Sequence, residues 1–593
     1  MKKSYYTLAL LSSLSPSHLW GARQAILPET GEPEGTRPNV VLILADDLGW
    51  GDLSCYGGRE QTPHVDSLAR RGIRFTNAHA VASTSTPSRY GMLTGCYPFR
   101  RQGTDVAAGN AGMIIQPEQL TVADVFHEAG YRTAAIGKWH LGLGSHTAEQ
   151  DWNGELDETP RDLGFDYHYI MAATADRVPC VFVEQGRVAN WDGEAPIAVS
   201  YRDSFPGEPL GRSHPELLTK QRASHGHDMA IVNGIGRIGY MKGGGRALWR
   251  DEDIADSLLA HAIRFIGTCT HSTGTHTTGT HSTGTHSTGT HTAGTRTQEN
   301  GKRPERQPFF LYFATNDVHV PRQPHERFRG TSTMGLRGEA IRQFDWTVGQ
   351  LMAALDSLGE LDNTLFILTS DNGPVLDDGY ADRAEELVGD HRPGGSFRGG
   401  KYSAFEAGSS VPFIVAAPED KEKIKEKKEK ISDRQVSQID LLASMAALTG
   451  VTLPANDSTQ TFSGPASSWP AAPDSRNCLA TWLGDLDSAP STQGISMSEA
   501  KLLPSGEAGE GLPFFHVTMA ANRSLTVRTQ RWKYIEPSNG GPMITWGPRI
   551  ETGYLSEPQL YDLVSDGGEK RNVAAENPTV VSRMRAIVDS LRK

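Results

Sequence analysis

The feature that most constrains the fold is a set of four short apolar runs separated by helical patterns. Continuous apolar runs of this length are typical of strands buried on both faces of a parallel sheet. Helices are expected to begin at Thr62-Pro63, at Thr121 and within DEDIADSLLAHAIRFI, and strand alternating with helix predicts a doubly wound α/β sheet. The four runs are VVLILA (Val40–Ala45), YRTAAIG (Tyr131–Gly137), PFFLYFA (Pro308–Ala314) and NTLFILTS (Asn363–Ser370).

Polar side chains follow each run at the point where the strand is expected to end. In open α/β sheets ligands bind beyond the carboxyl ends of the strands, so these side chains are expected at one edge. For any one of them alone, the alternative is a solvated loop or a helix cap; the four together predict a functional site. In chain order they are Asp46-Asp47, Lys138-Trp139-His140, Asn316-Asp317-Val318-His319 and Asp371-Asn372-Gly373.

A second region begins near Val451 and differs in pattern. Alternation in Leu525–Ile535 predicts a small antiparallel sheet, and VVSRMRAIVDSLRK predicts a C-terminal helix. We expect this region to pack on the first domain and to help wall the site. Upstream, His271–Thr295 repeats the pentapeptide H-S/T-T/A-G-T, which is typical of a flexible insertion. Metal binding by its histidines is the lesser alternative.

The N-terminus begins Met-Lys-Lys and continues with the short apolar stretch YYTLALLSSL. This pattern favours a signal peptide over a membrane helix, because the apolar stretch is too short to span a bilayer. A frayed tail is the alternative. We therefore expect an exported protein, periplasmic or secreted or on the cell surface, with no transmembrane segment. The net charge of −12 argues against a nucleic-acid partner.

The stretch TSTPSRYGMLTG contains Ser85 at the start of another expected helix. Thr86-Pro87 predicts an N-cap followed by proline at the first helical position, and Gly95 predicts the end. Ser85 is then expected just before the helix N-terminus, where negative charge is favoured. The simpler interpretation is a capping serine. Arg89, one turn further on, favours a functional role.

The motif from Ser85 to Gly95 resembles the Cys/Ser-x-Pro-Ser-Arg-x-x-x-Leu-Thr-Gly signature of the formylglycine-dependent sulfatases. Four further motifs occur in the family's order and approximate spacing: NVVLILADD from Asn39, GKWHLG (Gly137–Gly142), SDNG (Ser370–Gly373) and RGGK (Arg398–Lys401). The chain is thus similar to arylsulfatase-like, serine-type bacterial carbohydrate sulfatases.

The resemblance implies an alkaline-phosphatase-like, doubly wound mixed sheet flanked by helices, with a smaller C-terminal α+β subdomain that carries an antiparallel sheet. The expected organisation is a signal peptide (1–25), a catalytic domain (36–450) with the repeat insertion (270–300), and a C-terminal subdomain (451–593).

The resemblance also implies a covalent mechanism. Ser85 would be oxidised to 3-oxoalanine (Cα-formylglycine) by a serine-type sulfatase-maturing enzyme that recognises Pro87 and Arg89. The aldehyde would hydrate, one hydroxyl would attack sulfur and expel the sugar alcohol, and the other would drive elimination of sulfate. One calcium ion is implied, with hard oxygen ligands. Its ligands would be Asp46, Asp47, Asp371, Asn372 and the modified Ser85.

The same resemblance assigns roles to the basic residues. Lys138 and Lys401 would hold the sulfate oxygens, and Arg89 would steady the diol and a metal carboxylate. His140 would hydrogen-bond the diol or the sulfate and accept a proton in elimination. His319 would protonate the leaving oxygen, although either histidine can act as the acid.

The organic part of the substrate is predicted less directly. Asp176-Arg177, with His225 or His227, resembles the sugar-recognising part of sulfatases that act on 6-O-sulfated galactose or N-acetylgalactosamine. A carboxylate and a guanidinium suit an axial sugar hydroxyl, and a loop salt bridge is the alternative. The expected substrate is a sulfated glycan from mucin or glycosaminoglycan.

Two other functions stay open at this stage. One is a phosphodiesterase or phosphonate hydrolase of the same superfamily, which the Asp/Asn ligand set disfavours because a two-zinc site needs more histidines. The other is a non-catalytic protein that binds sulfated glycans, which would follow if Ser85 is never oxidised.

Overall fold

The computed structural model describes residues 37–145, 150–270, 306–419, 429–455, 470–485, 514–545 and 547–592. The predicted signal peptide lies outside these ranges, as does nearly all of the predicted 270–300 insertion. Within the described ranges no helix combines the length and the apolar character needed to cross a bilayer.

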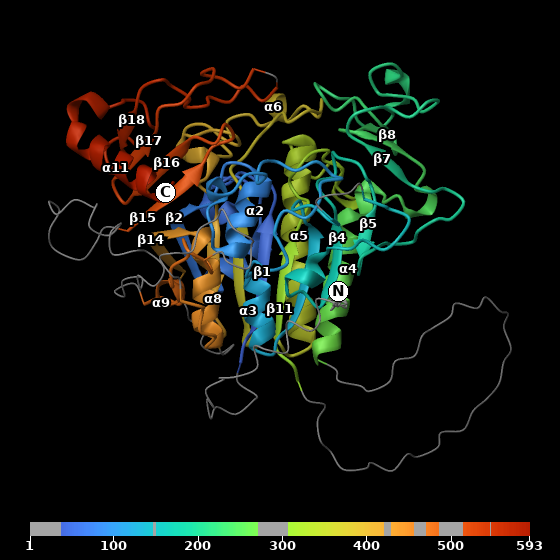
Figure 1. Cartoon of the computed structure of the whole chain (residues 1–593), viewed down its shortest axis with the longest axis horizontal. Coiled ribbons are helices and arrows are strands. Elements are labelled where there is room, and N and C mark those ends of the chain that lie inside the picture. Colours follow the sequence, from blue (N-terminus) through green and yellow to red (C-terminus); the bar gives the residue numbers. More distant parts are fainter. Residues whose placement is uncertain are drawn as a thin grey trace, which may run out of the picture. The chain divides into compact units, whose positions relative to one another are not determined.

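A ten-stranded mixed sheet runs through the centre of the structure (Figure 1). Five neighbouring strands, β12, β1, β11, β3 and β4, are parallel, while β13, β5 and β6 pair with their neighbours antiparallel. The predicted doubly wound mixed sheet is therefore confirmed. In spatial order the strands are β14 (Lys430–Ser437), β2 (Ile73–His79), β13 (Phe413–Ala416), β12 (Thr364–Ser370), β1 (Asn39–Ala45), β11 (Phe309–Ala314), β3 (Arg132–Lys138), β4 (Tyr167–Met171), β5 (Phe182–Glu184) and β6 (Arg187–Val188).

The four predicted apolar runs form four adjacent central strands, β12, β1, β11 and β3. Their residues are almost all buried, as expected of strands covered on both faces. The register places Ala45 opposite Ser370, and Ala314 opposite both Leu44 and Gly137. The carboxyl ends of the four strands therefore lie side by side.

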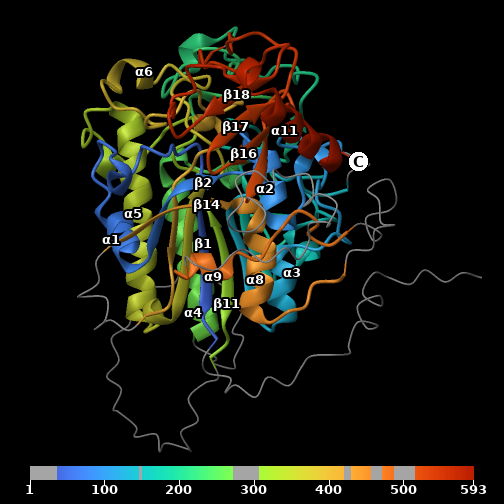
Figure 2. The ribbon, with the colours of Figure 1, turned by 90° about the vertical axis from the view of Figure 1, so that its left-hand side faces the viewer.

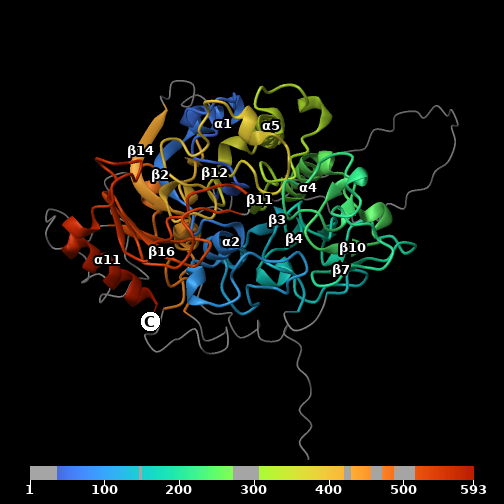
Figure 3. The same ribbon diagram turned by 90° about the horizontal axis from the view of Figure 1, so that it is seen from above.

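Helices cover both faces of the sheet, as Figures 2 and 3 show. On one face α5 contacts both α1 and α4, and on the other α2, α3 and α8 contact one another. The expected start at Thr121 is confirmed by a capping box between Thr121 and Asp124. The bounds are α1 (Pro63–Arg71), α2 (Ser85–Thr94), α3 (Val122–Glu128), α4 (Ile254–Thr270), α5 (Gly335–Ser357), α6 (Ala384–Leu387), α8 (Leu441–Thr449), α9 (Leu479–Trp482) and α11 (Pro578–Leu591).

Two short strand pairs lie outside the large sheet, in the segment between β6 and α4. They pair β7 (Ala198–Ser200) with β10 (Tyr240–Lys242) and β8 (Ile231–Val232) with β9 (Ile235–Gly236). This segment carries His225 and His227, which were predicted to recognise the sugar.

The C-terminal region contains the predicted antiparallel sheet and helix. Strands β15 (Phe515–Met519), β16 (Leu525–Thr529), β17 (Trp532–Ile535) and β18 (Gln559–Asp562) form the sheet, and α11 packs against it. Val81 and Ala82 share this hydrophobic core, and Ser83 donates its backbone N–H to Met519 O at 2.9 Å. The sheet thus packs on the chain that leads into α2, as expected. The domain boundary near residue 451 stays a prediction.

Candidate active site

The site lies where the four central strands end. The backbone N–H of Asp46 donates to Asp317 O at 2.9 Å, and that of Asp371 donates to Ala45 O at 3.1 Å. The second bond continues the pairing of β1 with β12 by one residue, and the first joins Asp46 to the loop that follows β11. They bring the polar residues that follow three different strands into contact, which is the arrangement expected from the sequence.

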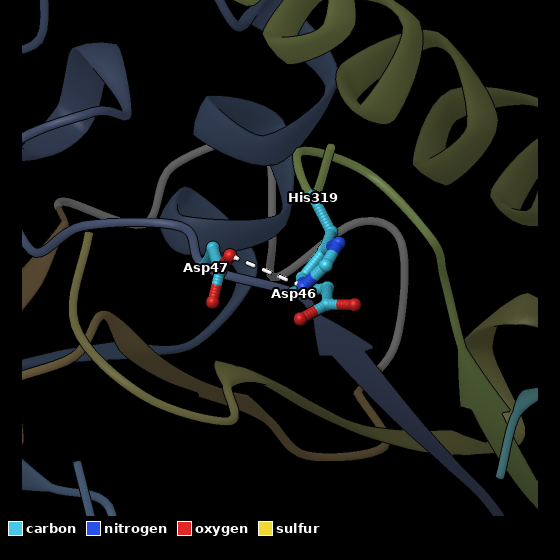
Figure 4. A group of neighbouring side chains, drawn as sticks. All are labelled: Asp46, Asp47 and His319. Carbon is cyan, nitrogen blue, oxygen red and sulfur yellow. Dashed lines mark ion pairs between the residues drawn. The ribbon is translucent and has the colours of Figure 1, made fainter. Parts of the chain in front are cut away.

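An acidic centre formed by Asp46, Asp47 and Asp371 occupies this edge. All three carboxylates are at most 1% exposed. Asp46, Asp47 and His319 each offer a ligand atom within 4.8 Å of the others (Figure 4). The compact group therefore includes His319 in place of Asp371, whose Oδ1 instead accepts the backbone N–H of Asp47 at 3.3 Å.

Three buried cations balance the acidic centre. Lys138 donates to Asp46 Oδ2 at 2.6 Å. Arg89 donates to Asp371 Oδ2 through Nε and Nη2, at 3.0 and 2.8 Å. Lys401 donates to Asp47 Oδ2 at 2.8 Å. Each carboxylate of the centre thus has its own cationic partner, and an anion that enters the site meets Lys138 and Lys401.

The close packing of these charges shifts their pKa values. Burial raises the pKa of Asp46 well above its usual value, and the charge of Asp371 adds to the rise. Burial also acts to raise the pKa of Asp371, but Arg89 and Lys138 outweigh it and hold the pKa below its usual value. Burial lowers the pKa of Lys138, although Asp46 and Asp371 oppose it. A bound cation would relieve the repulsion between the two acids.

Ser85 lies in contact with both the cations and the acidic centre. It is 3% exposed. Its hydroxyl accepts a hydrogen bond from Lys138 Nζ at 2.9 Å and donates to Asn372 Oδ1 at 3.3 Å. Asn372 in turn donates to Asp47 Oδ1 at 2.7 Å.

The predicted start of the Ser85 helix is wrong by two residues. α2 begins at Ser85 itself, with Thr84 as the N-cap, so Ser85 is the first helical residue and Pro87 the third. The Thr86 hydroxyl, expected to cap the helix, instead donates to His140 O at 2.9 Å. The Thr86 hydroxyl, which local capping rules assign to the helix N-terminus, is therefore used in a contact with the loop after β3. The predicted end is confirmed, since Gly95 adopts φ 62°.

His140 has a ring whose hydrogen bond defines its tautomer. Its Nε2 lies 3.0 Å from Ala107 O, so Nε2 carries the proton and Nδ1 is a free acceptor. Nδ1 is buried and has no partner among the described residues. Burial lowers the pKa of His140 well below its usual value, and Lys138 and Arg177 lower it further. His140 is therefore a neutral ring with an unused lone pair.

His319 is arranged in a similar way but faces other groups. Its Nδ1 donates to Val320 O at 2.7 Å, which leaves Nε2 as an acceptor 3.3 Å from Lys401 Nζ and 3.7 Å from Asp47 Oδ2. Burial and Lys401 lower the pKa of His319 to about 4. The predicted role of this histidine as an acid stays a prediction, because the ring is neutral as arranged here.

A second buried cluster contains the residues predicted to recognise the sugar. Arg177 lies 3.0 Å from Asp176 Oδ2, and His227 Nε2 lies 2.9 Å from the same oxygen. Thr174 donates to Asp176 Oδ1. Of the two candidate histidines, His227 is thus the one that contacts Asp176. His225 lies beside Ser224 and 3.9 Å from Asp377.

Sequence reasoning missed Asp378. This carboxylate is 4% exposed and accepts hydrogen bonds from Lys401 Nζ and the Tyr402 hydroxyl, both at 2.7 Å. Asp378 and Asp47 together raise the pKa of Lys401 well above its usual value, against burial, which acts to lower it. The Asp377-Asp378 pair shortly after SDNG was the available signal, but nothing local separates it from an exposed loop pair.

The residues present fit a calcium ion. The donors at the centre are carboxylates, an amide and a hydroxyl, with no thiol, which is the chemistry that calcium prefers. Asp46 Oδ1 is buried and has no hydrogen-bond partner among the described residues, although it lies among other carboxylates. A buried carboxylate oxygen of this kind is strongly stabilised by a cation.

Comparison with known proteins gives consistent matches. The sulfatase family model matches residues 38–179 and 215–451. The chain is 43% identical over 575 residues to an N-acetylgalactosamine-6-O-sulfatase of Bacteroides thetaiotaomicron, covering 97% of this chain and 96% of that protein. It is 31% identical over 438 residues to the steryl-sulfatase of Rattus norvegicus, covering 71% and 68%.

Solved structures agree with these matches. A structure described under the metabolism of multiple glycosaminoglycans by Bacteroides thetaiotaomicron superimposes with a TM-score of 0.78 at 42% identity, covering 94% of this chain and all of that one. A sulfatase from Pseudoalteromonas sp. superimposes with a TM-score of 0.58 at 19% identity, covering 94% and 90%. The second match supports the fold alone.

Proposed function

The chain belongs to the sulfatase family and is a sulfuric ester hydrolase, and from that premise we propose that it removes 6-O-sulfate from N-acetylgalactosamine or galactose in sulfated glycans. The contact of Ser85 with Lys138 and Asn372 carries the proposal, because it joins residue 85 to the acidic centre. The name of the 43% identical relative supports the choice of sugar.

The nucleophile of the proposed reaction is residue 85 after oxidation to 3-oxoalanine by a serine-type maturing enzyme. The hydrated aldehyde supplies a nucleophilic hydroxyl that serine lacks at neutral pH. The position of Ser85 at the N-terminus of α2, beside Lys138, favours negative charge on its oxygen.

Asp46, Asp47, Asp371, Asn372 and residue 85 would hold one calcium ion. When bound, the ion polarises the sulfate and offsets the repulsion among the acids. Arg89 holds Asp371 in place with two hydrogen bonds from its guanidinium, so this carboxylate keeps one orientation.

The basic residues bind and orient the sulfate. Lys138 donates to Asp46 and Lys401 to Asp47, and Asp378 accepts a further hydrogen bond from Lys401. His140 offers Nδ1 as a proton acceptor for a hydroxyl of the hydrated aldehyde. His319 offers Nε2 near Lys401 and would carry a proton to the leaving oxygen of the sugar.

The sugar is proposed to contact the second buried cluster. Asp176 and Arg177 present a carboxylate and a guanidinium next to each other, and His227 contacts the same carboxylate oxygen as Arg177. Arg177 contributes to the lowered pKa of His140, so the cluster lies within electrostatic range of the site. An axial hydroxyl of the sugar would bridge Asp176 and Arg177, as in a bidentate contact. His225 is retained as a more peripheral contact.

The direct test measures sulfate release from monosulfated sugars by protein produced with a serine-type maturing enzyme. N-acetylgalactosamine 6-sulfate and galactose 6-sulfate are expected to be hydrolysed, while 4-O-sulfated sugars and a phosphate diester are not. Peptide mass spectrometry should find residue 85 lighter than serine by about two mass units. Hydrolysis of the phosphate diester alone would favour the phosphodiesterase alternative. Binding without turnover, by protein shown to be modified, would favour the glycan-binding alternative.

Export is proposed as well. The basic start and short apolar stretch of residues 1–25 support it. N-terminal sequencing of protein from the periplasm or medium of an expressing cell should begin downstream of this stretch; an intact Met1 in the cytoplasm would contradict the proposal.

A further inference from the structure

Two surface hollows adjoin beside the loop of residues 390–401. The first has a volume of about 610 Å³ and is lined by parts of 51–59 and 390–396. The second has a volume of about 600 Å³ and is lined by parts of 392–398, by Glu551 and by parts of 568–570. Both are lined by Arg392 and Ser396, so they meet there and form one groove, here named the basic groove. No residue of the acidic centre lines it.

The basic groove has more positive than negative charge. Arg392 and Lys570 are exposed and make no ion pair with a carboxylate in the described part of the chain. Arg59 pairs with Asp390 at 3.2 Å, but the Asp390 side chain is 97% exposed, and such pairs are weak. The charged residues that line the groove are Arg59, Asp390, Arg392, Arg398, Glu551 and Lys570.

This charge contrasts with the rest of the chain. The net charge of the protein is −12, so the surface as a whole repels polyanions. The two unpaired cations of the basic groove therefore make it locally positive on a protein whose net charge is negative. Focused positive charge of this kind attracts anionic ligands, and salt screens the attraction.

The floor of the basic groove is fixed by buried contacts. Asp52 accepts two hydrogen bonds from Arg337, at 2.6 and 2.7 Å, and lies 2.9 Å from His391 Nε2. The backbone N–H of Gly51 donates to Pro393 O at 2.7 Å. These contacts hold the backbone on both sides of Arg392. A preformed groove loses little conformational entropy when a ligand binds.

The same loop connects the basic groove to the active site. Arg392 and Lys401 are nine residues apart along the chain, so their Cα atoms lie within roughly 30 Å of each other. Lys401 donates its backbone N–H to Pro374 O at 2.9 Å, in the turn that follows Asp371 and Asn372. The basic groove and the active site are therefore joined by one short loop.

We propose that the basic groove binds an anionic stretch of the same sulfated glycan chain whose 6-O-sulfated sugar occupies the active site. The inference rests on the proposed function, because it assigns the polymer that the active site trims. Arg392 and Lys570 each contact a sulfate or a uronate carboxylate, and Arg392 lies where the two hollows meet. Each hollow alone has the volume of a small-ligand site, so the two together suit an oligosaccharide better than a single ion.

The test compares a polymer with a monosaccharide in the double variant Arg392→Gln/Lys570→Gln. The polymer is a glycosaminoglycan that carries 6-O-sulfated N-acetylgalactosamine, and its dissociation constant is measured directly at low and at physiological salt. The variant is expected to bind the polymer roughly fivefold more weakly, since two exposed charge contacts are lost. KM for the polymer should rise in proportion, while kcat/KM for the monosulfated sugar stays within twofold.

The matched control is Arg70→Gln, which removes an exposed arginine of α1 outside the groove and should leave polymer affinity unchanged. Charge reversal, Arg392→Glu/Lys570→Glu, should weaken the polymer further. Unchanged affinity in both groove variants overturns the proposal. Equally tight binding of single-stranded nucleic acid by the wild type, lost in the same variants, would overturn the assignment to a glycan. Because affinity is measured without turnover, failure of the proposed activity would show separately, as absent sulfate release.

Discussion

The active site and a buried structural cluster next to the C-terminal sheet are both built from acids paired with bases, but different groups surround their acids. The structural cluster, here named the Glu406 cluster, consists of His79, Glu406, Arg528, Lys533 and Glu569. Glu406 Oε1 lies 2.6 Å from His79 Nε2 and 3.0 Å from Arg528 Nε, and its Oε2 lies 3.0 Å from Lys533 Nζ. Both oxygens of the central acid therefore have partners from the protein itself.

The electrostatic balance inside the two clusters is similar. In each cluster, the pKa of one acid lies above its usual value and the pKa of another lies below it. Burial raises the pKa of Glu569 to about 8 and that of Asp46 well above its usual value. The pKa of Glu406 and that of Asp371 both lie below their usual values, because nearby cations outweigh burial. Perturbed pKa values alone therefore do not distinguish a functional site from a structural one.

The surroundings of the two clusters do distinguish them. Arg528 and Lys533 come from β16 and β17, and His79 from β2, so Glu406 joins the C-terminal sheet to the large sheet. A buried carboxylate oxygen without a partner among the described residues occurs in both clusters, as Asp46 Oδ1 and as Glu569 Oε1, but at the active site Lys138 also joins Asp46 to the Ser85 hydroxyl. Charge in the Glu406 cluster holds two parts of the fold together, whereas charge at the active site is available to a cation and an anionic substrate.

The largest expected effect is the loss of turnover on substitution of Ser85 in the active site. Ser85→Ala removes the precursor of the nucleophile, so kcat for sulfate release should fall by at least roughly 10³-fold. The Ala variant retains helix propensity at the first position of α2, so its thermal unfolding midpoint should stay close to that of the wild type. Near-normal turnover would contradict the role of Ser85.

Ser444→Ala is the matched control for that change. Ser444 is also buried, in α8, and its hydroxyl accepts the backbone N–H of Cys478 at 2.9 Å. Its loss should reduce stability by about 1 kcal/mol while turnover is retained. Ser85→Ala is thus expected to abolish turnover and retain stability, whereas Ser444→Ala is expected to retain turnover and reduce stability.

The next largest effect belongs to the Glu406 cluster. Glu406→Gln leaves Arg528 and Lys533 buried beside a neutral amide, and an uncompensated buried charge costs about 3–5 kcal/mol. Urea unfolding should show this loss, while turnover per folded molecule at low temperature stays near that of the wild type. Glu576→Gln removes the partner of exposed Arg571 and should cost less than about 1 kcal/mol. Equal costs for the two variants would refute a structural role for the buried cluster.

The comparison also shows how far the sequence could predict this molecule. The four apolar runs became β1, β3, β11 and β12 with starts within one residue of those expected, because buried parallel strands have a strong local pattern. The residues that follow them were expected at one edge, and they are there. Local pattern and a motif that resembles a family signature were together enough to predict the sheet edge and Ser85.

The side-chain contacts that the sequence could not predict join residues that lie far apart along the chain. Glu406 meets residues 122 to 327 positions away, and no periodicity reports such contacts. Asp378 resembles an exposed loop acid until Lys401 is placed beside it. That His227 rather than His225 contacts Asp176 likewise depends on the conformation of the loop that carries both histidines. Long-range approach, rather than local propensity, decides each of these cases.

Calcium is expected to bind at the acidic centre of the active site and not at the Glu406 cluster. At a concentration 100 times its dissociation constant, an ion that binds only the native state stabilises it by about 2.7 kcal/mol. Calcium should therefore raise the unfolding midpoint of the wild type and of Glu406→Gln, and a chelator should reverse the shift. Asp46→Asn and Asp47→Asn should lose the response, because each removes a carboxylate of the centre. An undiminished shift in both would contradict the ligand assignment.

The smallest expected effect is a pH dependence of stability that Glu569 confers. Its pKa is raised from 4.5 to about 8 by burial and by the neighbouring Glu406, so between these values the native state holds a proton that the unfolded state has lost. Stability from this proton is complete below pH 4.5 and is lost as the pH rises through 8, with a slope of up to about 1.4 kcal/mol per pH unit.

Glu569→Gln keeps a neutral side chain at every pH. Urea unfolding between pH 6 and 8 should therefore find a shallower decline in stability for this variant than for the wild type. The exposed pair partner Glu576→Gln serves as the control and should keep the wild-type slope. Parallel stability curves for Glu569→Gln and the wild type would mean that Glu569 is ionised in the folded protein, which would contradict the raised pKa of this acid in the Glu406 cluster.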